Sequence, residues 1–169
     1  AMQEIEKLKL LSFDTGENTI RLDAKTVMQV VADSSRYNVY QLIDAALLGD
    51  VSRAQKMLAG LKNEGIFPLI ILAALCRELR TLLPMLEKKS EGQGVNAIIQ
   101  SGRVWFNRKQ AVTAALARLD TQSVWKLLDH SRLIDQSIKG LSRANPWIEL
   151  SLLLLQLSGA KPDKRDQVA

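Results

Sequence analysis

The stretch PLIILAALCRELRTLLPMLE, residues 68–87, has apolar side chains at the three- and four-residue spacing of one helix face. Pro68 suits the first helical position, where the missing amide donor of proline would have no partner anyway. Pro84 predicts a kink or an end in the last turns. The apolar stripe is wide enough for the central helix of a bundle; its members are Ile71, Leu72, Leu75, Cys76, Leu79, Leu82, Leu83 and Leu86. We therefore expect this helix to organise the fold.

Two shorter helical segments precede it, VYQLIDAALL (39–48) and VSRAQKMLAGLKNE (51–64), and each is followed by a glycine. Glycine takes the left-handed conformation that ends a helix at little cost. Asn38 and Asp50 are suitable N-caps for the two segments. Because only Gly49 and Asp50 separate them, the two segments should form a helical hairpin.

Helical spacing continues after residue 87. KKSEGQG (88–94) predicts a loop, VNAIIQS (95–101) a short helix, and residues 104–119 a longer one. Thr121 is a suitable cap for the next helix, which ends at Gly140.

The final helix has a complete start signal, with Asn145 as cap and Pro146 at the first position. Its apolar residues go nearly all round, so we expect it to be buried on most sides. Residues 160–169 are polar and lack periodicity, which predicts a flexible tail. Since almost every segment has helical spacing, the sequence predicts an all-α fold.

Length and composition are those of an ordinary soluble globular protein: 169 residues, 47% hydrophobic and 24% charged, with a formal net charge of +5. No apolar run is long enough to cross a bilayer, so we expect no membrane partner and a cytoplasmic location. Ala1 precedes Met2 in a helical pattern, and we expect the chain to be a piece of a larger protein.

The sequence offers no residues for an enzyme or a cofactor site. One cysteine, Cys76, and one histidine, His130, cannot make a usual four-ligand zinc site. No G-x-x-x-x-G-K-[ST] phosphate loop is present. His130 follows Asp129, but neighbours on a helix point about 100° apart and cannot form an orienting pair. We expect His130 to be a solvated or capping residue, and helix carboxylates such as Glu78 to be surface charges or local ion pairs.

GRVWFNRKQ, residues 102–110, has two interpretations. Trp105 and Phe106 could stack on bases while Arg103, Arg108 and Lys109 hold phosphate groups. Alternatively, Trp105 anchors a helix to the core and the basic residues face solvent or a neighbouring subunit. We favour the second interpretation, because an all-helical domain with 5% aromatic residues needs its few tryptophans as anchors. Trp125 and Trp147 are interpreted in the same way.

An ordered set of motifs resembles the delta subunit of the bacterial DNA polymerase III clamp loader. The motifs are QEIEKLKLL (3–11), NVYQLIDAALLGD (38–50), ALCRELRTLL (74–83), VW (104–105), LIDQSIKG (133–140) and WIELSLLLL (147–155). One departure is Val39, where the family usually has an aromatic residue that Tyr40 could supply one place later. The resemblance covers nearly the whole chain.

The resemblance implies a division of the chain. Residues 1–36 would be the C-terminal part of a helical lid domain, residues 37–159 a helical collar domain that mediates oligomerisation, and residues 160–169 the flexible tail. An N-terminal domain related to AAA+ proteins, which in this family touches and opens the sliding clamp, would be absent. The implied role is therefore subunit assembly in DNA replication, without catalysis or cofactors, inside a nucleotidyltransferase holoenzyme.

The implied partners are other clamp-loader subunits of the gamma/tau and delta prime type, bound through the collar. The sliding clamp would be reached only through the absent domain, and primer-template DNA only indirectly. The implied location is the bacterial cytoplasm, at the nucleoid. The residues that we expect to support packing or subunit contact are Asp44, Gly49, Asp50, Leu75, Leu79, Trp105, Ile134, Lys139 and Trp147.

A free-standing helical DNA-binding module is the alternative. The net charge of +5 and the GRVWFNRKQ stretch favour it. Affinity for DNA that falls steeply with salt and needs no partner subunit would support this alternative.

Overall fold

The computed structural model describes residues 39–160, and these residues form helices without any strand among them. A helix over residues 39–48 is followed by α3 (Val51–Asn63), α4 (Pro68–Ser90), α5 (Val95–Ser101), the short 3-10 helix η1 (Phe106–Arg108), α6 (Lys109–Arg118), α7 (Thr121–Ile138) and α8 (Pro146–Leu157). The all-α prediction is confirmed. The expected lid segment 1–36, the Asn38 cap and the tail from residue 161 lie outside the described residues.

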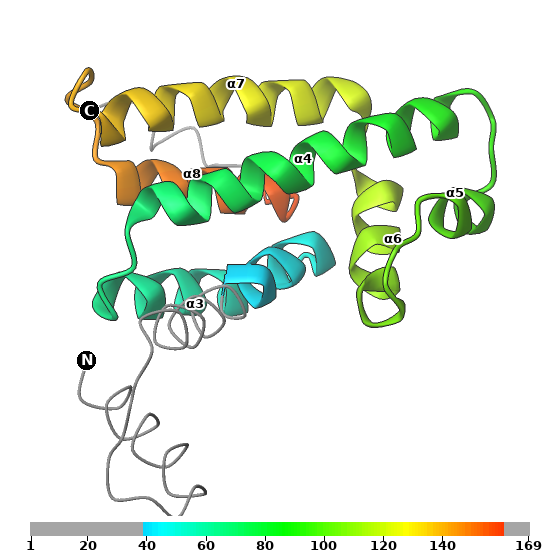
Figure 1. Cartoon of the computed structure of the whole chain (residues 1–169), viewed down its shortest axis with the longest axis horizontal. Helices are drawn as coiled ribbons and strands as arrows, with labels where there is room; N and C mark the ends of the chain where they lie inside the picture. The colour runs from blue at the N-terminus through cyan, green and yellow to red at the C-terminus, as the bar shows by residue number, and fades with distance from the viewer. Residues whose placement is uncertain (1–38, 161–169) are drawn as a thin grey trace, which may run out of the picture. The chain divides into compact units, whose positions relative to one another are not determined.

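The long helix α4 organises the described part, as its apolar stripe predicts. Leu75, Leu79 and Leu82 on its inner face are fully buried. α4 packs along α7, α7 packs on α8, and α8 packs on α3, while α5 and α6 lie against α4 near its C-terminal end (Figure 1). The core therefore lies between α4 and the helices on both of its sides.

Pro84 does not end α4, which continues to Ser90. A proline inside a helix costs about 3 kcal/mol, because it removes one hydrogen bond and crowds the preceding turn. Met85 and Leu86, directly after it, are buried, and burying such a side chain contributes about 1.5–3 kcal/mol. Core packing beyond Pro84 thus offsets the cost. The predicted loop 88–94 is shortened at its start, since residues 88–90 are helical.

Side-chain caps fix three of the helix starts. Asp50 Oδ1 accepts from the Arg53 amide at 3.0 Å, and Asn145 Oδ1 accepts from the Trp147 amide at 2.9 Å, as predicted. The cap of α7 is Asp120, whose Oδ1 accepts from the Ser123 amide at 2.7 Å. The prediction of Thr121 as this cap is wrong by one position, because a carboxylate directly before it makes the stronger, charge-assisted bond.

Candidate functional site

The structure separates the candidate residues into core and surface. Leu75, Leu79 and Ile134 are fully buried in the core that joins α4 and α7. Their side chains hold the bundle together and are not available to another molecule. Lys139 is exposed and pairs with Asp135 at 2.6 Å. Any contact with a partner must therefore use other residues on the surface of the bundle.

Arg108 ties three elements together. Its Nε donates to Oδ1 of Asp44 at 2.8 Å, and its Nη1 donates to Oε2 of Glu78 at 3.0 Å. Its Nη2 lies 2.7 Å from the same Asp44 oxygen. Burial by itself would lower the pKa of Arg108, but the hydrogen bonds to Asp44 and Glu78 outweigh this effect and raise it. The guanidinium therefore fixes the start of α6 against the helix at 39–48 and against α4.

This network corrects two expectations. Arg108 does not face solvent, because its side chain is only 23% exposed. Glu78 is not a surface charge, since only 8% of the residue is exposed and its partner lies 30 residues away in the chain. A buried carboxylate needs a compensating cation, and Arg108 supplies it. Asp44, one of the candidates from the sequence, is the second carboxylate that Arg108 binds within the bundle.

Trp105 and Phe106 are exposed, and the prediction that Trp105 anchors the core is wrong. Trp105 is 79% exposed and Phe106 is 87% exposed. The predicted helix 104–119 begins only at Lys109, and Trp105 has the extended angles φ −56° and ψ 143°. Arg103, just before, has a φ of 50°, a conformation that interrupts a helix. Helical spacing therefore does not apply at Trp105, and the aromatic side chain is largely exposed to solvent.

The exposed aromatic pair lies among basic side chains. Lys109 Nζ sits 5.5 Å from the ring centroid of Phe106, and Arg103 is exposed next to Trp105. A cation at this distance from an aromatic face is attracted to the ring. We name Arg103, Trp105, Phe106 and Lys109 the aromatic-basic patch.

Arg118 joins two helix ends, which the sequence did not reveal. Its Nη2 donates to the carbonyl oxygens of Leu47 at 2.9 Å, Leu157 at 3.1 Å and Ala46 at 3.3 Å. These carbonyls belong to the last turns of the helix at 39–48 and of α8, where a cation also interacts favourably with the helix dipole. Burial lowers the pKa of Arg118, although an arginine remains charged at neutral pH.

Two glycines make room for Arg118. Gly49 has a φ of 85° and Gly159 a φ of 83°. A Cβ at Gly159 would lie 2.4 Å from Cδ of Arg118, and a Cβ at Gly49 would lie 3.3 Å from Nη1 of the same side chain. Gly49, a candidate from the sequence, therefore serves both as a helix end and as space for the guanidinium.

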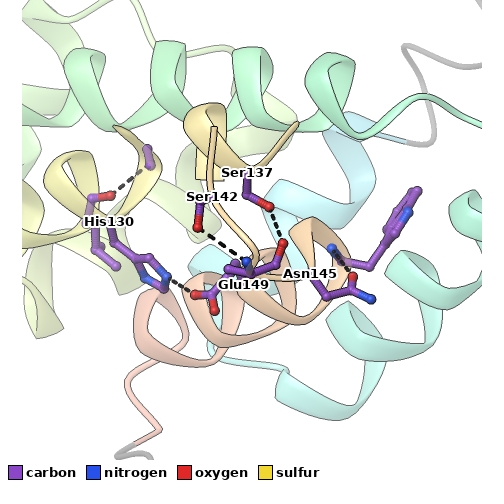
Figure 2. A network of polar contacts seen from close by, with 9 residues as sticks. His130, Ser137, Ser142, Asn145 and Glu149 are labelled. Atoms are coloured by element: carbon purple, nitrogen blue, oxygen red, sulfur yellow. Dashed lines mark hydrogen bonds and ion pairs between the residues drawn. The ribbon is translucent and has the colours of Figure 1, made fainter. Parts of the chain in front are cut away.

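The α7–α8 junction holds the single histidine (Figure 2). His130 Nε2 lies 2.7 Å from Oε2 of Glu149, which joins the two helices, so His130 is neither a solvated residue nor a cap. Ser137 Oγ donates to the Ala144 carbonyl at 2.6 Å, and the Ala144 amide donates to Ser142 Oγ at 3.2 Å. These bonds satisfy the backbone of the connecting turn.

The other two tryptophans differ from each other. Trp147 is partly buried against the core, as predicted, and Lys62 Nζ of α3 lies 5.8 Å from its ring centroid. Trp125 is 57% exposed, so the prediction that it anchors the core is wrong. Its neighbour Val124 is fully buried, and adjacent positions on a helix point about 100° apart. Trp125 therefore lies on the exposed side of α7, although its neighbour Val124 is buried.

The described residues offer neither a cluster of metal ligands nor a membrane-spanning helix. Between residues 39 and 160, no group of three or more His, Cys, Asp or Glu side chains is placed to hold a metal ion. None of the helices described there has the length and apolar character needed to cross a membrane.

Comparisons with known proteins identify the bundle. A family model described as the processivity clamp loader gamma complex DNA polymerase III C-terminal region matches residues 39–163. The chain is 32% identical to the DNA polymerase III subunit delta of Escherichia coli strain K12 over 155 residues, which are 92% of this chain and 43% of that protein. It is 30% identical to the subunit delta of Haemophilus influenzae over 145 residues, which are 81% of this chain and 42% of that protein.

A solved structure supports the fold. The Bacillus subtilis DNA clamp loader delta protein superimposes with a TM-score of 0.53 at 22% identity, covering 93% of this chain and 45% of that protein. The chain thus spans less than half the length of the relatives that it matches. Because the family model covers most of the chain, and because the packed helices coincide with its match, the chain belongs to the family of the delta subunit of the bacterial DNA polymerase III clamp loader.

Proposed function

We propose that this chain acts in DNA replication as the assembly region of a clamp-loader delta subunit. The observation that carries the proposal is the family match over residues 39–163, the part of the chain that contains the packed bundle. In this proposal residues 37–159 form the collar domain, residues 1–36 end a lid domain and residues 160–169 form a tail. The chain contributes contacts rather than catalysis.

The surface of the bundle supports an assembly role. Large apolar side chains are exposed on several helices, including Phe67 and Ile70 at the start of α4, Leu141 after α7 and Ile148 on α8. These apolar side chains are available for contact with another subunit. We propose gamma/tau and delta prime type subunits as the partners, a bacterial nucleoid location, and contact with the sliding clamp only through a further N-terminal domain.

Competition for assembly tests this proposal. A piece covering residues 37–159 is added in increasing amounts to the other clamp-loader subunits and labelled full-length delta, and the labelled complex is followed by size-exclusion chromatography. We expect the piece to displace labelled delta, because both use the collar surface. If the folded piece displaces nothing at concentrations where full-length delta assembles, residues 37–159 are not the assembly region.

The aromatic-basic patch supports a second role, contact with single-stranded DNA. Two aromatic rings that are 79% and 87% exposed next to Arg103 and Lys109 form a small stacking platform with phosphate-binding cations. The names of the relatives give no support to a free-standing DNA-binding module, so we propose this contact as one made within a loader. A contact at this patch would be direct, whereas the resemblance implied only an indirect contact with primer-template DNA.

A titration distinguishes a DNA contact at the patch from none. Fluorescently labelled single-stranded, primed and duplex DNA are titrated, at several salt concentrations, with loader complexes that contain either the unchanged chain or its Trp105→Ala variant. We expect Trp105→Ala to weaken single-stranded DNA binding by about tenfold, since one base-aromatic stack contributes about 1–3 kcal/mol. Equal affinities of the two proteins would exclude a stacking role for Trp105.

A further inference from the structure

A groove of about 820 Å³ runs along the surface between α4 and α7. These two helices lie side by side (Figure 1). On α4 the lining extends from Leu69 to Thr81, which corresponds to about 18 Å at 1.5 Å per residue. Trp125 on α7 lines the groove as well. The groove is therefore as long as about three turns of another helix.

The floor of the groove is apolar and its rim is rich in arginine. Leu72 is buried at the floor, with Cys76 partly buried beside it. Arg77, Arg80 and Arg132 line the groove, and none of its lining residues is a lysine. Protein interfaces are enriched in arginine and tryptophan and depleted in lysine. This composition is typical of a surface that binds protein.

The arginines are available to an acidic partner. Among the ion pairs within residues 39–160, none involves Arg77 or Arg80. Arg132 pairs with Asp129 at 3.3 Å, but both side chains are more than half exposed, so the pair is easily exchanged. Asp135, an acidic residue of the lining, already pairs with Lys139 at 2.6 Å. The net field at the groove is therefore positive.

Trp125 gives the groove an anchor point. It is 57% exposed, and it is not required for the core, which Val124 fills at the neighbouring position. An exposed tryptophan beside arginines has the composition of an interface hot spot, in which one aromatic side chain contributes much of the affinity.

We propose that the α4–α7 groove binds an amphipathic helix of a neighbouring clamp-loader subunit, with an apolar face on Leu69, Cys76 and Trp125 and acidic side chains on Arg77 and Arg80. This inference rests on the assembly role proposed above and assigns the face that performs it. The exposed apolar lining selects a protein helix over nucleic acid, because a phosphate backbone would leave Leu69, which is 40% exposed, and Trp125 without apolar contacts.

Substitutions at the groove test this inference in assembly assays of the whole chain with the other loader subunits. We expect Trp125→Ala to weaken assembly by about tenfold or more, and Arg77→Glu with Arg80→Glu to weaken it at least as much. Arg53→Glu, at an exposed arginine of α3, is the matched charge control and should assemble as the unchanged chain does. Since these residues are exposed, all variants should keep the melting temperature of the unchanged chain.

The single cysteine supplies an independent readout, because Cys76 lines the groove. Its modification by a small maleimide is followed by mass spectrometry of the Cys76 peptide, alone and in the assembled complex. We expect the rate to fall by about tenfold or more on assembly, because an occupying helix would exclude the reagent. A cysteine placed on the exposed end of α4 by Ser90→Cys should keep its rate.

The outcomes separate the two proposals. If the unchanged chain assembles while the groove variants assemble equally well and Cys76 stays reactive, the inference is wrong and the assembly role stands. If the unchanged chain does not assemble, the assembly role fails and the inference fails with it. If the groove variants assemble normally but lose affinity for single-stranded DNA, the groove serves nucleic acid and the inference is overturned.

Discussion

Replacing Arg108 by methionine should destabilise the bundle more than any change at an exposed arginine. The substitution keeps much of the aliphatic packing but leaves Glu78, whose side chain is 10% exposed, without its cation. Removing one partner of a fully buried ion pair costs about 3–5 kcal/mol. Because the Arg108 and Asp44 side chains are 23% and 29% exposed, we expect a cost below that range, about 2–3 kcal/mol.

The melting temperature makes this cost measurable. For a domain of this size, 1 kcal/mol corresponds to roughly 3–5 °C, so Arg108→Met should lower the melting temperature by roughly 6–15 °C. Thermal unfolding followed by circular dichroism at 222 nm measures the change. Arg103→Met is the matched control within the same stretch, and it should change the melting temperature by less than about 2 °C, since Arg103 is exposed.

A double-mutant cycle isolates the contribution of the pair. Glu78→Gln removes the buried charge, so the double variant Arg108→Met with Glu78→Gln should be more stable than the sum of the single changes implies. We expect a coupling of about 1–2 kcal/mol from denaturant unfolding. A coupling near zero, or an Arg108→Met variant as stable as the Arg103→Met control, would refute the account of this network.

Three further predictions concern other parts of the bundle. Gly159→Ala should lower the free energy of unfolding by about 2 kcal/mol or more, because its Cβ would clash with Arg118. Gly65 also has a positive φ but faces open space, so Gly65→Ala should cost only about 1 kcal/mol. Equal losses in denaturant unfolding would contradict this. Trp105→Ala should change stability by less than about 0.5 kcal/mol in the same assay, and a larger loss would restore the core anchor that the sequence suggested. The hydrogen bond from Ser123 lowers the pKa of Asp120 below its usual 3.8, so the cap should stabilise the fold above that pH and lose its effect as the pH falls through the folded pKa. Asp120→Ala should therefore be less stable than the unchanged chain at pH 6, and this difference should shrink as the pH is lowered below 3.8.

Local signals predicted the helices well. The wide stripe of α4, the Asp50 and Asn145 caps, and Pro68 and Pro146 at first helical positions all act within one or two turns of the chain. Such signals can be read without knowledge of the tertiary structure. Of the two outcomes predicted at Pro84, an end of the helix is excluded, since α4 continues and buries Met85 and Leu86.

Long-range pairing set the limit of prediction. Arg108 contacts Asp44, which lies 64 positions away in the sequence, and Arg118 contacts Leu47, which lies 71 positions away. No local sequence pattern contains both partners of either contact. Trp105 was misplaced because a helical period was assumed from residue 104 onward, whereas Trp105 is extended and α6 begins only at Lys109. The α4–α7 groove could not be foreseen either, since it depends on which faces of two helices lie together.

The most direct test of the central claim is native mass spectrometry of the chain mixed with the other clamp-loader subunits. The account predicts a complex that contains this chain, that forms with residues 1–169 alone and that loses the chain when Trp125→Ala is combined with Arg77→Glu and Arg80→Glu. A chain that stays separate from those subunits under conditions where full-length delta joins them would contradict the assembly role.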